Sequence, residues 1–261
     1  MHSFTPLIVA ASLALTLLNL STARLTGGLP HPKLTKPITT YAPVAVLELF
    51  TSQGCSSCPA ADRLLTETLA EAAKANKNII GLSFHVDYWD RLGWKDPFSN
   101  HSFTQRQYQY SERFAQTGVY TPQEVLNGQQ EFVGSNRNKQ SSTLKEALSI
   151  PATADIKLTV STPQNNQLTI SYLLAGDLTK AVLHVAVVSK TTETIVNRGE
   201  NAGRKLAHDN VVRVFLTVPA TEKGVVTLAL PIDYDARNGA VVAYVQTQQT
   251  LAIRGAEKVN L

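Results

Sequence analysis

The only cysteines of this 261-residue chain, Cys55 and Cys58, lie three positions apart in the segment FTSQGCSSCPAADRLL (50–65). A cysteine at the N-terminus of a helix meets unpaired amide groups and the positive end of the helix dipole, and both favour the thiolate. A second cysteine one turn later can attack a mixed disulfide intramolecularly. Pro59 suits the first turn of such a helix. The pattern predicts redox chemistry, with Cys55 as the nucleophile and Cys58 as the resolving thiol.

Other uses of the pair explain the spacing less well. A purely structural disulfide across so short a loop would remove only about 2 kcal/mol of chain entropy, against about 4.7 kcal/mol for a loop of roughly one hundred residues. A zinc site lacks ligands, since there is no second cysteine pair and the nearest histidine is His85. Soft thiolates do suit Cu(I), so a copper-binding protein that uses Cys55, Cys58 and His85 is an alternative. A binding protein with a relic disulfide is another. We expect no resident cofactor or metal.

The residues around the pair predict the elements that must position it. VAVLELF (44–50) is apolar on both faces, as in a buried parallel strand, and NIIGLSFHV (78–86) is a second such run. Between them, the apolar stripe of residues 62–77 predicts a helix. Strand, helix and strand in this order predict a right-handed parallel crossover. The cysteines follow the carboxyl end of the first strand, where the active sites of open parallel sheets lie.

The rest of the chain predicts two domains. Three further elements are expected before residue 150: a helix near 103–116, a hairpin at 122–134 and a helix at 138–150. The hairpin is indicated by Asn127 and Gly128, a strong turn pair. This is the element order of a thioredoxin-like fold, an α/β domain with a central mixed sheet and flanking helices over residues 44–150. After Pro151, short β-branched runs separated by turn residues predict an antiparallel β-sandwich-like domain over residues 151–261.

The N-terminus predicts export. The first 23 residues contain no Asp, Glu, Lys or Arg, and residues 6–20 form an apolar run of signal-peptide length. We expect a signal peptide over residues 1–23 with cleavage after Ala23, and an uncleaved anchor is the alternative. Residues 24–43 are rich in Pro, Gly and Thr and are expected to form a linker. The mature protein is expected to be periplasmic or secreted, where disulfides persist, without a further segment that could span a membrane.

The composition bears on the class of protein and its partners. With 43% hydrophobic and 17% charged residues, the chain is globular. Its formal charge of +4 is not gathered into a dense Lys/Arg run, which argues against nucleic-acid binding. Nothing in the sequence fixes the oligomeric state.

Four motifs together resemble a known family. In chain order they are FTSQGCSSCPAADRLL, SFHVDYWDRLGWKDPFS, VYTPQEVLNGQQEFVGSNR and RGENAGRKL. They are similar to a family of exported thioredoxin-like proteins designated domain of unknown function 1223, and the resemblance runs from about Val44 to Gln246. It implies a thioredoxin-like domain followed by a β-rich domain, and it supplies no substrate or reaction.

The resemblance also implies a cis-proline that faces the cysteines. Pro122, preceded by Thr121, takes that role, in which the neighbouring backbone groups are free to pair with a bound peptide; an ordinary turn proline is the alternative. Gly54 replaces the aromatic residue that precedes the first cysteine in ordinary thioredoxins. Their buried acid would align with Leu49, so Glu48 is either a displaced proton shuttle or a strand carboxylate satisfied by other groups.

Other polar and aromatic residues are expected near the cysteines. His85 and Asp87 share a face of the second strand, either as an acid–base pair that serves the thiols or as a satisfied polar corner. Trp89 and Trp94 follow in a loop, either as a wall of the substrate site or as packing for the insertion. The polar loop 197–210 docks over the redox centre, binds an anion through its arginines, or is a solvated connection.

Together these features predict an exported thiol–disulfide oxidoreductase. Its partners would be protein or small-molecule thiols and disulfides. The direction of the exchange is left open, because it depends on the residues around the two cysteines and their amide groups.

Overall fold

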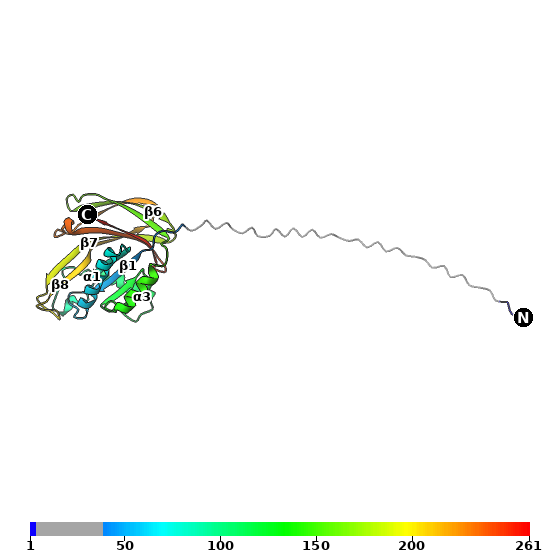
Figure 1. The fold of residues 1–261 in the computed structure, drawn as a ribbon, viewed down its shortest axis with the longest axis horizontal. Helices are drawn as coiled ribbons and strands as arrows, with labels where there is room; N and C mark the ends of the chain where they lie inside the picture. Colours follow the sequence, from blue (N-terminus) through cyan, green and yellow to red (C-terminus); the bar gives the residue numbers. More distant parts are fainter. Residues whose placement is uncertain (4–38) are drawn as a thin grey trace. The chain divides into compact units, whose positions relative to one another are not determined.

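The computed structural model describes residues 1–3 and 39–261, and one compact unit spans Ile38–Leu261 (Figure 1). Almost all of the predicted signal peptide (1–23) and most of the predicted linker (24–43) lie outside the described residues. In the part of the chain that the structure describes, no helix combines the length and the apolar character needed to cross a membrane.

The first half of the unit has the predicted order of strands and helices. Its elements are β1 (Ala45–Thr51), α1 (Cys58–Lys74), β2 (Ile79–His85), the short 3-10 helix η1 (Asp90–Leu92), α2 (His101–Arg113), β3 (Gln123–Leu126), β4 (Gln130–Val133) and α3 (Arg137–Ala147). The two predicted strands are parallel neighbours over their whole length, from Ala45 opposite Ile79 to Thr51 opposite His85. The predicted strand–helix–strand crossover is therefore confirmed.

Helix α1 begins four residues earlier than predicted, at Cys58 instead of Asp62. Ser57 is its N-cap residue and Pro59 lies in its first turn, where a proline costs no hydrogen bond. The helix ends at Lys74 because Asn76 takes a left-handed conformation, with φ of 49°. The early start matters for function, because it makes Cys58 the first helical residue.

The predicted hairpin forms between β3 and β4. Leu126 pairs with Gln130, so the turn takes three residues and not two. Asn127 and Gly128 have φ of 49° and 65°, a left-handed conformation that favours these two residue types. The Asn127 side chain also accepts a hydrogen bond from the Val46 amide, which ties the turn to β1.

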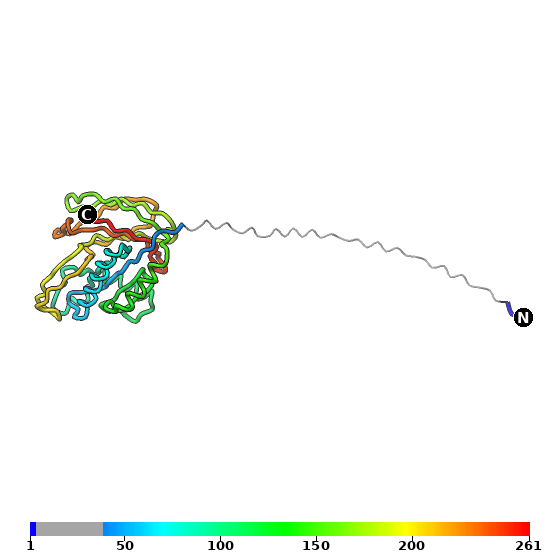
Figure 2. The backbone as a smooth tube through the Cα atoms, viewed as in Figure 1, coloured from blue at the N-terminus to red at the C-terminus, as the bar shows by residue number. Residues whose placement is uncertain are grey.

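The second half of the unit joins the sheet of the first half. Its elements are β5 (Ala154–Val160), β6 (Gln167–Gly176), β7 (Ala181–Ile195), β8 (Lys205–Pro219), β9 (Lys223–Ala229), the 3-10 helix η2 (Ala236–Asn238), β10 (Gly239–Thr247) and β11 (Ile253–Asn260). An eight-stranded mixed sheet has the order β11-β10-β7-β8-β2-β1-β3-β4, and a separate antiparallel sheet has the order β5-β6-β9. The two halves meet where Ser83 of β2 pairs in parallel with Val211 of β8. The predicted division near residue 150 therefore does not separate two sheets (Figure 2).

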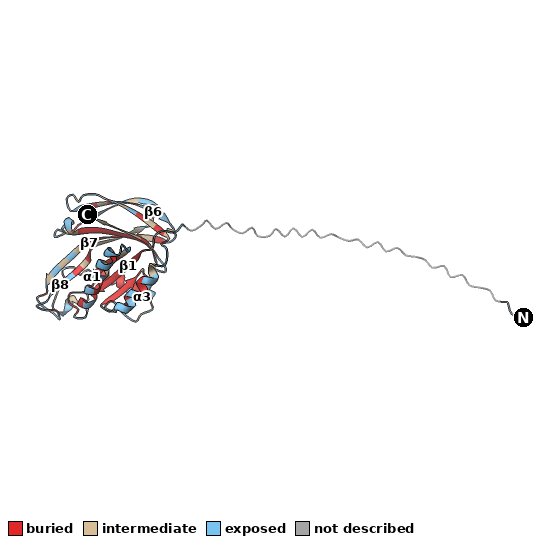
Figure 3. Ribbon diagram, viewed as in Figure 1, coloured by how far each residue is buried: buried red, intermediate tan, exposed pale blue. Residues whose placement is uncertain are grey.

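The helices cover both faces of the eight-stranded sheet. On one face, Leu47 and Leu49 pack with Ala61 and Leu65 of α1, in a cluster that extends to α3. On the other face, Phe50 and its neighbours pack against α2. The three-stranded sheet covers β7 and β10 through a third cluster, and most of the eight-stranded sheet is buried (Figure 3). Alternation along β1 thus decides which side chains reach α1 and the cysteines.

Candidate functional site

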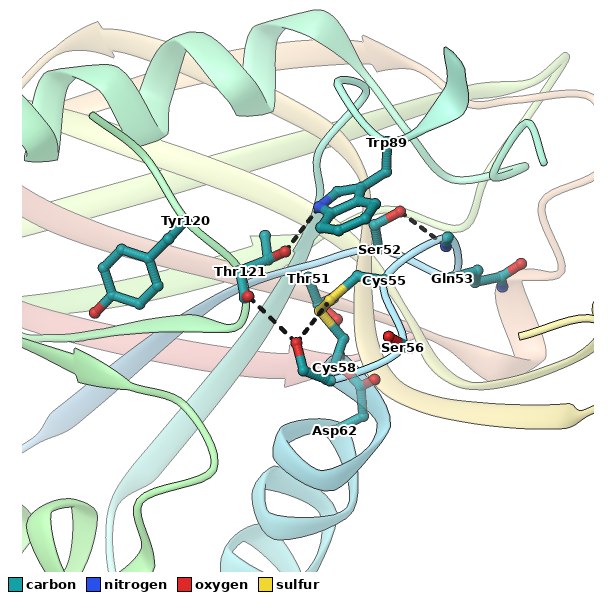
Figure 4. Close-up of a disulfide and its surroundings, with 12 residues drawn as sticks. Thr51, Ser52, Gln53, Cys55, Ser56, Cys58, Asp62, Trp89, Tyr120 and Thr121 are labelled. Atoms are coloured by element: carbon teal, nitrogen blue, oxygen red, sulfur yellow. Dashed lines mark hydrogen bonds between the residues drawn. A yellow bond between two sulfur atoms is a disulfide. The ribbon is translucent and has the colours of Figure 1, made fainter. Parts of the chain in front are cut away.

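A disulfide joins Cys55, in the segment between β1 and α1, to Cys58, the first residue of α1 (Figure 4). The two Cα atoms are 5.4 Å apart, within the usual range for a disulfide. The Cys55 amide donates to the Ser52 carbonyl (3.2 Å), and the Cys58 amide donates to the Cys55 carbonyl (3.3 Å). Both cysteines are fully buried, whereas Ser56 and Ser57 between them are exposed. Solvent therefore meets the disulfide first at these two serines.

The Ser57 hydroxyl connects the cysteine loop to the Thr121–Pro122 segment. It lies 3.3 Å from the Cys55 Sγ atom and 3.5 Å from the Thr121 carbonyl oxygen (Figure 4). The Thr121–Pro122 peptide bond is cis, as expected from the sequence. The structure thus brings Pro122 and Thr121 to the cysteines, although they are more than sixty residues away along the chain.

Both tryptophans of the chain contact this region. The Trp89 Nε1 atom donates to the Thr121 Oγ1 atom (2.8 Å), and Trp94 Nε1 donates to Gln53 Oε1 (3.1 Å). Both rings are half-buried. A Cβ atom added to Gly54 would lie 3.2 Å from the Trp89 Cβ, which gives a steric reason for glycine before the first cysteine. The loop that carries Trp89 and Trp94 therefore belongs to the site and also packs against the cysteine loop.

The polar loop that begins at residue 197 docks on the cysteine loop. The side-chain amide of Asn201, which is fully buried, donates to the carbonyls of Gln53 and Cys55, at 2.9 Å in each case. Arg204 in turn donates to Asn201 Oδ1 (2.7 Å). The Ser56 amide donates to the Glu200 carboxylate (3.0 Å), and hydrogen bonds from Ser56 lower the pKa of Glu200. Of the three roles expected for this loop, the structure shows docking.

The expected pair of His85 and Asp87 does not form. His85 Nδ1 lies 2.7 Å from an Asp96 carboxylate oxygen, and both residues are fully buried. Asp87 instead accepts from the Thr104 hydroxyl (2.6 Å) and contacts His101 (3.0 Å). Of the two roles expected for His85, the structure shows the polar corner, in which its Nδ1 atom is hydrogen-bonded. The pair with Asp87 does not form because β2 ends at His85, so the alternation of a strand no longer applies at Asp87.

The buried partner of His85 also touches the cysteine loop. Asp96 accepts a hydrogen bond of 2.8 Å from the Gln53 amide. Burial raises the pKa of Asp96. Its contact with His85 and the hydrogen bonds from the Gln53 and Phe98 amides lower the pKa by more, so the net pKa is below the usual value. Asp96 is therefore the carboxylate that holds His85 in place.

Glu48 belongs to a different buried network. Its carboxylate accepts two hydrogen bonds from Arg106 and one of 2.6 Å from the Tyr110 hydroxyl. Glu48 alternates with Leu49 along β1, so it faces α2, whereas Leu49 faces α1. Of the two roles expected for Glu48, the structure shows the satisfied strand carboxylate, on the face away from α1.

A protein-family model matches residues 46–246, and its description is protein of unknown function (DUF1223). The chain belongs to the DUF1223 family. The matched region runs from β1 to β10 and covers strands on both sides of residue 150, so the family match is not confined to the cysteine region. No curated protein matches this DUF1223 chain in sequence.

Two solved structures are similar to this DUF1223 protein. The crystal structure of protein AGR_C_4864 from Agrobacterium tumefaciens has 27% sequence identity and a TM-score of 0.65, and the match covers 85% of this chain and 96% of that one. HBP35 of Porphyromonas gingivalis has 15% identity and a TM-score of 0.57, over 85% of this chain and 76% of that one. The second similarity concerns the fold alone.

Several residues of the DUF1223 site were not singled out from the sequence. Asp62 lies one turn after Cys58 on α1, and its i,i+4 spacing is a signal that could have found it. His208 of β8 and Asn201 lie about 150 residues from the cysteines; both belong to the polar segment 197–210, but nothing in the sequence singles them out within it. They reach the site because β8 joins the sheet beside β2.

Proposed function

We propose that this DUF1223 protein is a thiol–disulfide oxidoreductase with a thioredoxin-like active site. One observation carries the proposal: the Cys55–Cys58 disulfide lies at the start of α1 and is linked through the Ser57 hydroxyl to the carbonyl of Thr121. This arrangement supports an exchanging disulfide better than a structural one, because the bond spans a very short loop and so contributes little chain entropy.

The proposed exchange transfers two electrons between the protein and a partner dithiol. A partner thiolate attacks the Cys55 Sγ atom, the Cys55–Cys58 bond breaks, and its electron pair leaves on Cys58, which takes up a proton. The second partner thiolate then attacks the partner sulfur of the mixed disulfide and releases Cys55 as a thiolate. The partner dithiol is oxidised to a disulfide and the protein disulfide is reduced to two thiols. The reverse sequence reduces a partner disulfide.

Three features support Cys55 as the sulfur that reacts with the partner. It precedes the N-cap residue of the 17-residue helix α1, whose positive end favours an anion. The Ser57 hydroxyl lies 3.3 Å from its sulfur and can donate to the thiolate. Cys58, by contrast, lies inside the first turn of the helix.

The surroundings suggest how a partner would be held. The Thr121 carbonyl lies beside the exposed serine, and the Trp89 ring is fixed by its bond to Thr121. We propose that an extended peptide pairs with the Thr121 backbone and packs on Trp89. The proposal includes export to the periplasm or the outside of the cell, supported by the apolar run at residues 6–20.

The Cu(I) alternative would hold the ion with Cys55, Cys58 and His85. In the described ranges, no group of three or more His, Cys, Asp or Glu side chains is arranged to hold a metal ion. His85 Nδ1 is occupied by Asp96. We therefore put copper binding forward only as an outcome to be measured.

The test is the reduction of insulin by dithiothreitol, followed by turbidity, with the wild-type protein and with Cys55→Ser. We expect the wild type to accelerate the reduction and Cys55→Ser to lose the acceleration. A wild type no faster than Cys55→Ser contradicts the proposal. In a parallel titration of the reduced protein with Cu(I) under a competing chelator, tight retention that depends on Cys55, Cys58 and His85 would favour the copper alternative.

A further inference from the structure

Four ionisable side chains form a buried cluster beside the cysteine loop: Asp62 of α1, His85 of β2, Asp96 and His208 of β8, here called the His–Asp cluster. All four are at most 4% exposed. His208 Nδ1 lies 3.4 Å from Asp62 Oδ1, and His85 Nδ1 lies 2.7 Å from Asp96 Oδ2. The two imidazole rings lie nearly perpendicular, with centroids 4.7 Å apart. The cluster thus places two histidine–aspartate pairs in contact.

Much of the cluster lacks hydrogen-bond partners. In residues 39–261, four of its buried atoms have none: Asp62 Oδ2, His85 Nε2 and both ring nitrogens of His208. A buried polar atom without a partner costs about 1–3 kcal/mol, and most buried polar groups are satisfied. So many unsatisfied atoms at one place indicate a functional use for their donor and acceptor capacity.

Asp62 connects the cluster to the disulfide. It lies four residues after Cys58 on α1, and residues with this spacing share a helix face. Its Oδ1 atom accepts from the Thr51 hydroxyl (2.9 Å), and Figure 4 places Asp62 on the turn below Cys58. The other carboxylate oxygen is the one without a partner.

Cys58 needs such a group when the disulfide opens. Its sulfur then carries the electron pair of the broken bond in a fully buried position, where an uncompensated charge is unfavourable. Water does not reach it in the oxidised structure. An internal proton donor would neutralise the leaving sulfur at once.

We propose that Asp62 and His208 form a proton relay for Cys58, an inference that rests on the proposed exchange reaction. As the partner thiolate forms a bond to Cys55 and the Cys55–Cys58 bond breaks, the His208 imidazolium gives up its proton. The Asp62 carboxyl group passes this proton to the Cys58 sulfur, and His208 is left neutral until it takes a proton from solvent. When the disulfide forms again, the proton returns along the same path. The His85 ring, bonded to Asp96, packs against the His208 ring.

The charges around His208 suit this role. Asp62 faces it from α1, His85 from β2 and Asp96 from the loop after β2, and Asp209 is its neighbour on β8. Burial lowers the pKa of His208, but the negative charges of Asp62, Asp96 and Asp209 raise it more, so the net pKa lies above the usual value of 6.5. His208 is therefore protonated at the acidic side of neutrality.

The test follows the opening of the disulfide in the full chain by dithiothreitol between about pH 5 and pH 9. Each rate is divided by the rate at which dithiothreitol reduces oxidised glutathione at the same pH, which cancels the ionisation of the reductant. For the wild type we expect a relative rate that falls as the pH rises through the titration of His208. His208→Gln should lower the relative rate at acidic pH by about 10²-fold and remove the fall. Asp62→Asn should also lower the relative rate at acidic pH and remove the fall, because an amide cannot carry the proton from His208 to Cys58.

His184→Gln is the matched control. His184 is also a buried histidine, bonded to Thr217 and Gln246, and burial lowers its pKa to about 2, so it stays neutral throughout. This variant should keep the wild-type profile. A wild-type profile in His208→Gln would overturn the relay. The assay needs only chemical opening of the bond, so it tests the relay even if the protein fails to accelerate insulin reduction.

A second measurement uses the wild type alone, in case a variant does not fold. NMR titration of the His208 imidazole in the oxidised and the reduced protein should give different midpoints, because Cys58 exchanges a proton with the cluster only when reduced. Identical midpoints in the two redox states would overturn the relay.

Discussion

The side-chain amide of Asn201 donates a hydrogen bond of 2.9 Å to the carbonyl oxygen of Cys55, across 146 positions of the chain. The same amide donates to the Gln53 carbonyl, so it closes the cysteine loop from the side of the second half. The cysteine loop is thus contacted by a segment that joins β7 to β8. The two cysteines lie in one sixteen-residue segment (50–65), but the structure around them depends on residues from both halves of the unit.

Removing the side-chain amide of Asn201 should expose the disulfide. Asn201→Ala leaves two buried carbonyls without their donor, and we expect a loss of about 1–3 kcal/mol in the free energy of unfolding. The disulfide should also be reduced several-fold faster by glutathione, because both cysteines are covered in the native loop. Urea unfolding and the reduction rate check this. Asn138→Ala, at an exposed position on α3, should change neither quantity. An unaltered reduction rate in Asn201→Ala would contradict the role of Asn201 in covering the disulfide.

Glu48 should matter for stability and not for exchange. Glu48→Gln leaves the Arg106 guanidinium, which is 5% exposed, without its charged partner, and a broken buried ion pair costs about 3–5 kcal/mol. The folded variant should exchange thiols at the wild-type rate, because Glu48 faces α2. Glu67→Gln breaks the exposed pair with Arg137 and should change the free energy of unfolding little, because solvent screens such pairs. Slower exchange by folded Glu48→Gln would restore the shuttle role.

The buried carboxyl of Glu124 on β3 should make stability fall as the pH rises. Burial raises its pKa to about 8, against 4.5 as the ordinary value, although hydrogen bonds from Gln140 lower it in part. The folded state therefore holds a proton that the unfolded state releases between these two pH values, and stability is lost across that range.

The variant Glu124→Gln isolates this effect. Its free energy of unfolding should approach that of the wild type near pH 4.5 and exceed it by a few kcal/mol above pH 8, since each unit of pKa shift is worth about 1.4 kcal/mol. Chemical denaturation at several pH values measures the difference. A difference that does not change with pH would show that Glu124 is ionised in the folded protein.

Trp89 should act on substrate binding and not on the reactivity of the thiols. Trp89→Phe keeps an aromatic ring but removes the donor to Thr121, worth about 0.5–1.5 kcal/mol. We expect KM for a peptide disulfide to rise several-fold with little change in kcat. Trp94→Phe, which loses a bond to Gln53 instead, is the comparison. An unchanged KM in Trp89→Phe would separate this ring from the peptide site.

The fold could be predicted wherever neighbouring residues decide it. The apolar runs of β1 and β2 and the turn at Asn127 and Gly128 each give a local signal, and all three elements are present. The division near residue 150 could not be judged locally, because the second half joins the first through a single pairing, Ser83 with Val211. Short β-branched runs look the same in a separate sandwich and in an extension of an existing sheet.

The site, too, could be predicted only where neighbouring residues give a local signal. The cysteine spacing is a local signal and led directly to the disulfide. His208 and Asn201 come from the second half, and only the placement of β8 beside β2 brings them to Cys58 and Cys55. The alternation of side chains along a strand predicted that His85 and Asp87 share a face. The strand ends at His85, and the carboxylate that contacts His85 is that of Asp96.

The proposed function depends above all on Cys55 being an activated thiol that exchanges with partner disulfides. The direct test incubates Cys58→Ser with oxidised glutathione at neutral pH and follows the mixed disulfide by mass spectrometry. We predict that Cys55 is glutathionylated faster than free cysteine, and that Cys58 in Cys55→Ser reacts much more slowly. If Cys55 reacts no faster than free cysteine, or Cys58 is the more reactive of the two, the proposed function is contradicted.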